Sequence, residues 1–154
     1  MKIESERCLI REFRKEDMDS FMDYRNDLEW MKYQGFKGLK KEEYIKSIIG
    51  QNNLEEGFQL AIIEKDKNKL IGDLYLKKEE NIIWIGYSIA KSMSRQHYAY
   101  EVLLATVEFL KDIDVKYIKA VIDVDNAASI ALIKKLNFLY ETEENGEKIF
   151  FLEL

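Results

Sequence analysis

The 154-residue sequence contains no proline, one cysteine and one histidine. A lone cysteine, Cys8, excludes an intramolecular disulfide and a cysteine-rich metal site. Because Cys8 falls in an expected strand, far along the chain from the only histidine, His97, we expect a buried structural thiol and not a catalytic nucleophile. A single histidine also argues against a zinc enzyme, so no metal site is predicted.

Long apolar runs and blocks of like charge are also absent. The apolar stretches fall far below the ~20 residues that span a bilayer, and the charged opening Met1-Lys2-Ile3-Glu4 does not resemble a signal peptide. The net charge is −5, without a basic surface pattern. We therefore expect a cytoplasmic protein without a nucleic-acid or membrane partner. An acidic protein suits a cationic substrate such as an amine.

The sequence also lacks a Gly/Ser-rich linker and an internal repeat. With 47% hydrophobic and 34% charged residues, it has the composition of a globular protein. These features predict a single domain over residues 1–154.

The spacing of apolar residues predicts strands alternating with helices. Helices are expected at residues 15–25, 40–53, 98–111 and 126–136. Strands are expected at residues 7–13, 58–64, 70–76, 82–89, 117–124, 138–142 and 148–152. Asn145-Gly146 is a strong hairpin signal, and the strand at 117–124 is apolar on both faces near its centre. This order predicts a mixed α/β sheet covered by helices, with one βαβ crossover.

Two separate segments resemble a known binding site. One reads Ile85-Gly86-Tyr87-Ser88-Ile89 and continues through Ser94-Arg95-Gln96-His97-Tyr98-Ala99-Tyr100-Glu101. The other begins Asn126-Ala127-Ala128-Ser129 and ends Lys134-Lys135-Leu136-Asn137-Phe138. Together they resemble the acyl-coenzyme A site of the GNAT superfamily of N-acetyltransferases. The opening Glu6-Arg7-Cys8-Leu9-Ile10-Arg11-Glu12-Phe13, with Glu16-Asp17, resembles the ribosomal-protein N-acetyltransferase branch.

The resemblance implies the GNAT fold, a mostly antiparallel sheet with a parallel βαβ unit and helices on both faces. It also implies an acyltransferase that uses acetyl-CoA as co-substrate. Anionic phosphates are held well by free N–H groups at a helix N-terminus. A pantetheine arm can pair with a strand end, and Gly86 suggests either a bulge that exposes this end or an ordinary strand residue. The implied cofactor-binding residues are Ser88, Ile89, Ala90, Arg95, Gln96, His97, Tyr98, Ala99, Tyr100, Asn126, Ser129 and Lys135.

The phosphate-binding loop departs from the family pattern. Ser94 replaces the usual Arg or Gln, and His97 replaces a glycine. Because only a positive φ would require that glycine, we expect the loop to keep its function in an altered form. Alternatively, the loop is degenerate and binds coenzyme A weakly or not at all. Asn137 also replaces a glycine, but asparagine tolerates the left-handed conformation that ends a helix.

The residues expected to perform catalysis are Ser129 and Asp73. Many relatives carry a glutamate base where this chain has Trp84, and a tyrosine proton donor where it has Ile133. Asp73 is the only carboxylate within the strands at 70–76 and 82–89. It is therefore a candidate base, or else a solvated residue on a half-exposed face. The resemblance makes Ser129 the residue that steadies the leaving thiolate, with Tyr98 and Tyr140 as alternatives.

The acceptor is expected to bind through Tyr33 and Phe36, in an aromatic loop beside Tyr44, although such aromatics also serve in packing. The sequence thus predicts acetyl transfer to a primary amine, either a protein N-terminus or a small molecule, by direct attack. The alternative is an inactive GNAT-fold module that binds coenzyme A or a protein partner. The apolar strand Ile149-Phe150-Phe151-Leu152 would allow a homodimer.

Overall fold

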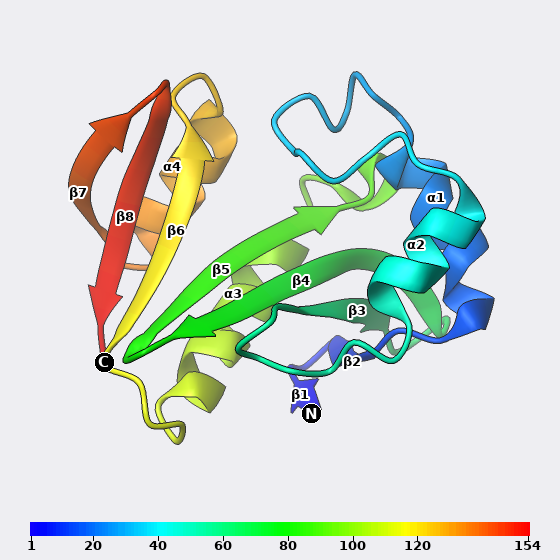
Figure 1. Cartoon of the computed structure of the whole chain (residues 1–154), viewed down its shortest axis with the longest axis horizontal. Coiled ribbons are helices and arrows are strands. Elements are labelled where there is room, and N and C mark those ends of the chain that lie inside the picture. The colour runs from blue at the N-terminus through cyan, green and yellow to red at the C-terminus, as the bar shows by residue number, and fades with distance from the viewer.

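A computed structural model describes all 154 residues, which form one eight-stranded mixed sheet and four α-helices (Figure 1). In sheet order the strands run β1-β2-β3-β4-β5-β6-β8-β7, and only β5 and β6 pair in parallel. The strands are β1 (Ile3–Glu4), β2 (Cys8–Glu12), β3 (Phe58–Glu64), β4 (Lys69–Glu79), β5 (Ile82–Ile89), β6 (Tyr117–Asp123), β7 (Leu139–Glu144) and β8 (Glu147–Glu153).

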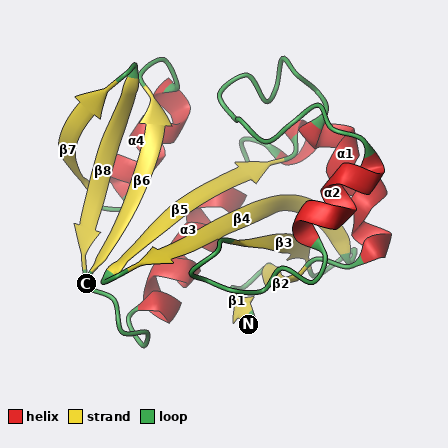
Figure 2. Ribbon diagram, in the orientation of Figure 1, coloured by secondary structure: helices red, strands yellow, loops and turns green.

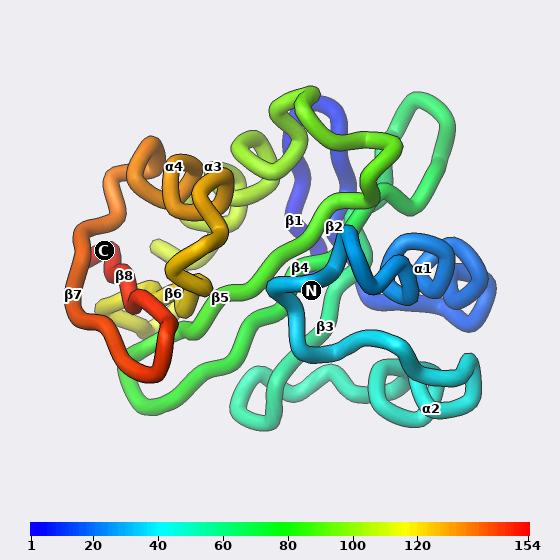
Figure 3. Tube along the Cα trace, turned by 90° about the horizontal axis from the view of Figure 1, so that it is seen from above, coloured from blue at the N-terminus to red at the C-terminus, as the bar shows by residue number.

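The helices cover both faces of the sheet (Figure 3). They are α1 (Met18–Arg25), α2 (Lys41–Ile48), α3 (Tyr98–Leu110) and α4 (Ala127–Lys135), with short 3-10 helices at Lys15–Asp17 and Lys91–Met93. The larger apolar cluster joins α3 and α4 to one face of the sheet, and the smaller one joins α1 and α2 to the other. This arrangement confirms the predicted fold class, including the crossover from β5 through α3 to β6. None of the four helices combines the length and the apolar character that crossing a membrane requires.

The central strands β5 and β6 separate part way along their length. Their parallel pairing joins Ile82–Trp84 to Tyr117–Lys119 and then stops. Beyond it β6 continues with β8, while β5 stays paired with β4. The sheet therefore opens into a V between β5 and β6 (Figure 1).

The long loop between α1 and α2 lies at the open end of this V (Figure 2). The Trp30 indole donates to the Ile89 carbonyl at 2.8 Å, and the Gln34 amide donates to the Tyr87 carbonyl at 3.3 Å. The Tyr33 hydroxyl donates to the Asp125 carbonyl at 3.1 Å, between β6 and α4. Three side chains of one loop thus connect the two arms of the V.

Three local expectations need correction, and one short strand was not predicted. Helix α2 ends at Ile48, five residues before residue 53, because Ile49 is extended and Gly50 has a φ of +80°. The bulge suggested at Gly86 is absent, since β4 and β5 pair without a register shift. Strand β6 is open on one face, where Val121 is 44% exposed. Strand β1 was not predicted, because its two residues are too few to show a sequence pattern and become a strand only by pairing with β2.

Candidate active site

A cleft of about 730 Å³ lies where β5 and β6 separate. This volume suits a ligand larger than a simple amine. Its walls come from the end of β5, the start of α3, the start of α4 and the loop before α2. Four cationic side chains line it against one carboxylate, Glu29, although the protein as a whole is acidic. The cations are Lys32, Lys91, Arg95 and Lys135. Such a cleft favours an anionic ligand.

The free edge of β5 forms one wall of this cleft. The Ala90 N–H donates to the Ile71 carbonyl of β4. Because backbone groups alternate in direction along a strand, Tyr87 and Ile89 then direct their N–H and C=O groups toward the edge that β6 has left. The separation of the strands, and not a bulge, exposes the groups to which a pantetheine amide can bind. The Ala90 N–H is not available to such a ligand, because it already donates to the Ile71 carbonyl.

The loop before α3 adopts left-handed backbone at two residues that are not glycine. Arg95 has a φ of 59° and His97, the residue that caps the helix, has a φ of 64°. Position 97 therefore has the positive φ that favours glycine, and the loop keeps the conformation that glycine would adopt without strain. The side chain of His97 is exposed.

The first N–H groups of α3 remain available to a ligand. The first four N–H groups of a helix have no partner within the helix. Here the N–H groups of His97, Tyr98, Ala99 and Tyr100 have no hydrogen-bond partner elsewhere in the chain. With Arg95 beside them, they form a site suited to a pyrophosphate group.

The start of α4 brings a hydroxyl pair into the same cleft. Asn126 caps this helix, since its Oδ1 accepts the N–H of Ser129 at 3.2 Å. The Ser129 hydroxyl is hydrogen-bonded to the Tyr87 hydroxyl of β5. Burial raises the pKa of Tyr87 to about 12, and the bond to Ser129 only partly opposes this rise. Tyr87 therefore stays protonated at neutral pH and can hold the serine hydroxyl in place.

A second pocket, of about 410 Å³, lies on the α1 and α2 side of β5. Tyr87 and Gln34 line both this pocket and the larger cleft. The two cavities therefore meet at the free edge of β5. The arrangement allows a ligand in each cavity to approach the other at Tyr87.

Asp73 lines the smaller pocket and is 1% exposed, which contradicts the alternative that it is a solvated surface residue. Its Oδ1 accepts from Arg25 and Gln59, each at 2.6 Å. Its Oδ2 accepts from Tyr24 at 2.5 Å and from Ser88 at 2.6 Å. Four donors thus hold the carboxylate in one orientation beside the edge of β5.

The large cleft collects most of the predicted cofactor-binding residues. Those that line it are Ser88, Ile89, Arg95, His97, Tyr98, Ala99, Tyr100, Asn126, Ser129 and Lys135. Ala90 and Gln96 do not line it. The Lys135 ammonium also lies 4.4 Å from the centre of the Tyr100 ring.

The residues predicted to bind the acceptor lie in different parts of the structure. Phe36 lines the smaller pocket, whereas Tyr33 lines the larger cleft and Tyr44 is buried in the core. Tyr140, one alternative proton donor, is exposed on β7 and packs against Phe150, outside both cavities.

Sequence reasoning did not assign a role to the side chains of Tyr87 and Gln34. Tyr87 belongs to the quoted Gly-Tyr motif, so its position was visible, but its bond to Ser129 joins residues 42 positions apart. Gln34 lies in the aromatic loop, and nothing in its neighbours along the chain indicates a contact with β5.

Comparison with known proteins identifies the family of the chain. Residues 7–139 match the family model described as an acetyltransferase (GNAT) domain. The uncharacterized N-acetyltransferase YnaD of Bacillus subtilis (strain 168) is 28% identical over 144 residues, which cover 92% of this chain and 84% of YnaD.

Two of the solved structures that share the fold illustrate the likeness. A GNAT-family acetyltransferase from Bacillus anthracis superimposes with a TM-score of 0.87 at 22% identity, over 99% of this chain and 98% of its own. The ribosomal L7/L12 alpha-N-protein acetyltransferase RimL, solved with coenzyme A, gives a TM-score of 0.85 at 19% identity, over 100% of this chain and 98% of its own.

Proposed function

Because the chain belongs to the GNAT family of acetyltransferases, we propose that it transfers an acetyl group from acetyl-CoA to a primary amine by direct attack. The observation that carries this proposal is the meeting of two cavities at the free edge of β5. The larger cleft has the cations and free N–H groups that suit coenzyme A. The smaller pocket gives an amine access to the same strand edge.

The donor would lie along β5, with its pyrophosphate at the start of α3. Arg95 and the N–H groups of residues 97–100 would bind the phosphates. The N–H and C=O groups of Ile89 would pair with the pantetheine amides, so the Trp30 indole that now donates to the Ile89 carbonyl would give way. Lys135 and Asn126 would border the arm as it approaches Tyr87.

In the transfer, the neutral amine attacks the thioester carbonyl carbon, the new C–N bond forms, and the C–S bond breaks to release the thiolate. The proton that the nitrogen loses on becoming an amide passes to solvent. A free N–H on the β5 edge would donate to the carbonyl oxygen as it gains negative charge. Ser129 would donate a hydrogen bond to the departing thiolate. Tyr87, protonated because of its raised pKa, would donate to the Ser129 oxygen and leave the serine proton free to point at sulfur.

Asp73 contributes a fixed negative charge beside the acceptor pocket. Arg25 forms an ion pair with Asp73 and balances this charge. Glu56 also lines the pocket, is exposed and forms no ion pair, so it leaves the pocket with one unbalanced negative charge. This balance suits a cationic amine. A role for Asp73 in deprotonating that amine stays a prediction, since each of its oxygens already accepts two hydrogen bonds. Phe36 would pack against the acceptor.

The acceptor class is a protein N-terminus or a small amine, and the RimL likeness favours the former for the first trials. The test is release of free coenzyme A from acetyl-CoA, followed with a thiol reagent, across peptides with different N-termini and a set of polyamines. The protein's one cysteine is buried, so the reagent reports coenzyme A alone. Amine-dependent thiol release, with one acetyl group on the amine by mass spectrometry, supports the proposal. Coenzyme A binding without turnover of any amine would favour the inactive module instead.

A further inference from the structure

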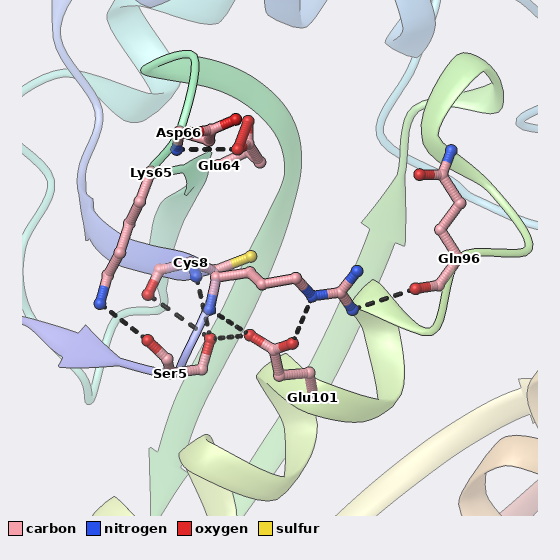
Figure 4. A network of polar contacts seen from close by, with 8 residues as sticks. Ser5, Cys8, Glu64, Lys65, Asp66, Gln96 and Glu101 are labelled. Atoms are coloured by element: carbon pink, nitrogen blue, oxygen red, sulfur yellow. Dashed lines mark hydrogen bonds and ion pairs between the residues drawn. The ribbon is translucent and has the colours of Figure 1, made fainter.

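A polar network connects the N-terminal strands to the start of α3 (Figure 4). Arg7, between β1 and β2, donates from Nε to Glu101 at 2.7 Å and from its backbone N–H at 2.8 Å. The Ser5 hydroxyl donates to the same carboxylate. Burial alone would raise the pKa of Glu101, but the hydrogen bonds from Ser5 and Arg7 lower it below its ordinary value. Glu101 is therefore a firm anchor for the Arg7 guanidinium.

The same guanidinium reaches the phosphate-binding loop. Arg7 Nη2 donates to the Gln96 carbonyl at 3.0 Å, and its guanidinium carbon lies 3.9 Å from the centre of the Tyr98 ring. One side chain thus contacts the residues on both sides of His97. Gln96 in turn lies between Arg95 and His97, the two residues with left-handed backbone. Such backbone is unfavourable for a residue with a Cβ, and it persists only where surrounding contacts hold it.

The direction of the Gln96 carbonyl also sets the direction of a donor. In a trans peptide the C=O and N–H groups point in opposite directions. Because the Gln96 carbonyl faces Arg7, the His97 N–H of the same peptide faces away from Arg7. Arg7 itself does not line the cleft. Its influence on a bound phosphate must therefore pass through the loop.

We propose that Arg7 is a positioning residue for the pyrophosphate of acetyl-CoA. It holds the 95–97 loop in its left-handed conformation and keeps the Gln96 carbonyl turned away from the phosphates. The N–H groups of residues 97–100 then remain directed at the ligand. This inference rests on the proposed function, since it assumes that coenzyme A is the ligand of the cleft.

The test compares ligands with and without the pyrophosphate. Arg7→Met keeps an apolar chain over Tyr98 but removes the guanidinium that donates to Gln96 and Glu101, while the backbone N–H of residue 7 still donates to Glu101. Calorimetric titration with coenzyme A should show affinity at least tenfold weaker than in the wild type. Competition experiments with pantetheine, which has no pyrophosphate, should show a change of less than twofold. Equal losses for both ligands, or no loss for either, would overturn the inference.

Two further variants show whether a loss of affinity comes from the loop or from a general loss of folding. Lys111→Met removes an exposed ion pair with Glu108 near the other end of α3 without touching the loop, and it should leave both affinities unchanged. Glu101→Gln weakens the anchor of Arg7 and should reduce coenzyme A affinity in the same ligand-selective way, by a smaller factor. A Glu101→Gln variant with full coenzyme A affinity would contradict the proposed anchor.

Activity measurements separate this inference from the proposed function. If coenzyme A binds and Arg7→Met weakens it selectively, the inference stands even when no amine is acetylated. If the wild type turns over but Arg7→Met changes kcat at saturating acetyl-CoA and not KM, the positioning role is wrong while the function stands. A wild type that binds no coenzyme A would overturn both.

Discussion

Replacing His97 with glycine should stabilise the protein, although His97 lies in the proposed binding loop. Its φ of 64° is unfavourable for any residue with a Cβ, at a cost of about 1–2 kcal/mol. Glycine removes this cost, but it also gives the unfolded chain more conformational freedom, which lowers the free energy of unfolding by about 0.5–1 kcal/mol. The His97 side chain is exposed, so its removal forfeits little packing. With the middle value of each range, the expected net gain is about 0.75 kcal/mol.

For a chain of this length, that gain corresponds to a rise in melting temperature of roughly 1–4 °C. Calorimetry or circular dichroism would measure it in three variants under the same conditions. His97→Ala removes the imidazole but keeps the strained φ, so its stability should stay within about 0.5 kcal/mol of the wild type. Asn137→Gly should also change little, because asparagine accommodates its φ of 69° at lower cost. If His97→Gly melts no higher than His97→Ala, the argument from backbone strain is wrong.

Further predictions concern the hydroxyl pair, the buried ion pair and the buried thiol. Ser129→Ala should lower kcat roughly 10- to 100-fold, more than it raises the KM for acetyl-CoA, since a hydrogen bond to a charged group contributes about 1.5–3 kcal/mol. Tyr87→Phe should lower kcat as well and add little to Ser129→Ala, whereas full additivity in a double-mutant cycle would show that the pair does not act as a unit. Asp73→Asn should destabilise the protein by about 3–5 kcal/mol in urea unfolding, because it leaves the buried Arg25 guanidinium without its counter-charge; a loss below 1 kcal/mol would contradict this. Burial raises the pKa of Cys8 from 9.0 to about 11, so its contribution to stability is complete below pH 9 and is lost as the pH rises toward 11. Cys8→Ala should therefore lose less stability than the wild type between pH 9 and 11, as measured by urea unfolding at each pH.

Local sequence signals predicted the elements whose conformation depends on near neighbours. Strands β3 and β5 have the expected bounds. Asn145-Gly146 forms the hairpin turn with positive φ at both residues, and Asn137 ends α4 in the left-handed conformation. In each case the residue type itself restricts the backbone. The predictions of the family and of an acetyltransferase are confirmed by the match over residues 7–139.

Features that depend on distant parts of the chain were not predictable in this way. The exposed edge of β5 arises where β6 diverges, not from Gly86 itself, so a local reading of that glycine suggested a bulge. The positive φ of His97 depends on the hydrogen bond from Arg7 to the Gln96 carbonyl, and no residue adjacent in the sequence indicates this conformation. Asp73 likewise looked solvated because its donors come from α1, β3 and β5.

The most direct test of the account is a calorimetric titration of the wild-type protein with acetyl-CoA at two salt concentrations. The cleft between β5 and β6 should bind one molecule per chain, and the affinity should fall as salt screens the lysines and arginine that line it. His97→Gly should bind through the same loop. If the wild type shows no binding at either salt concentration while His97→Gly binds, histidine has abolished the phosphate site and the wild-type chain is not an acetyl-CoA-dependent enzyme.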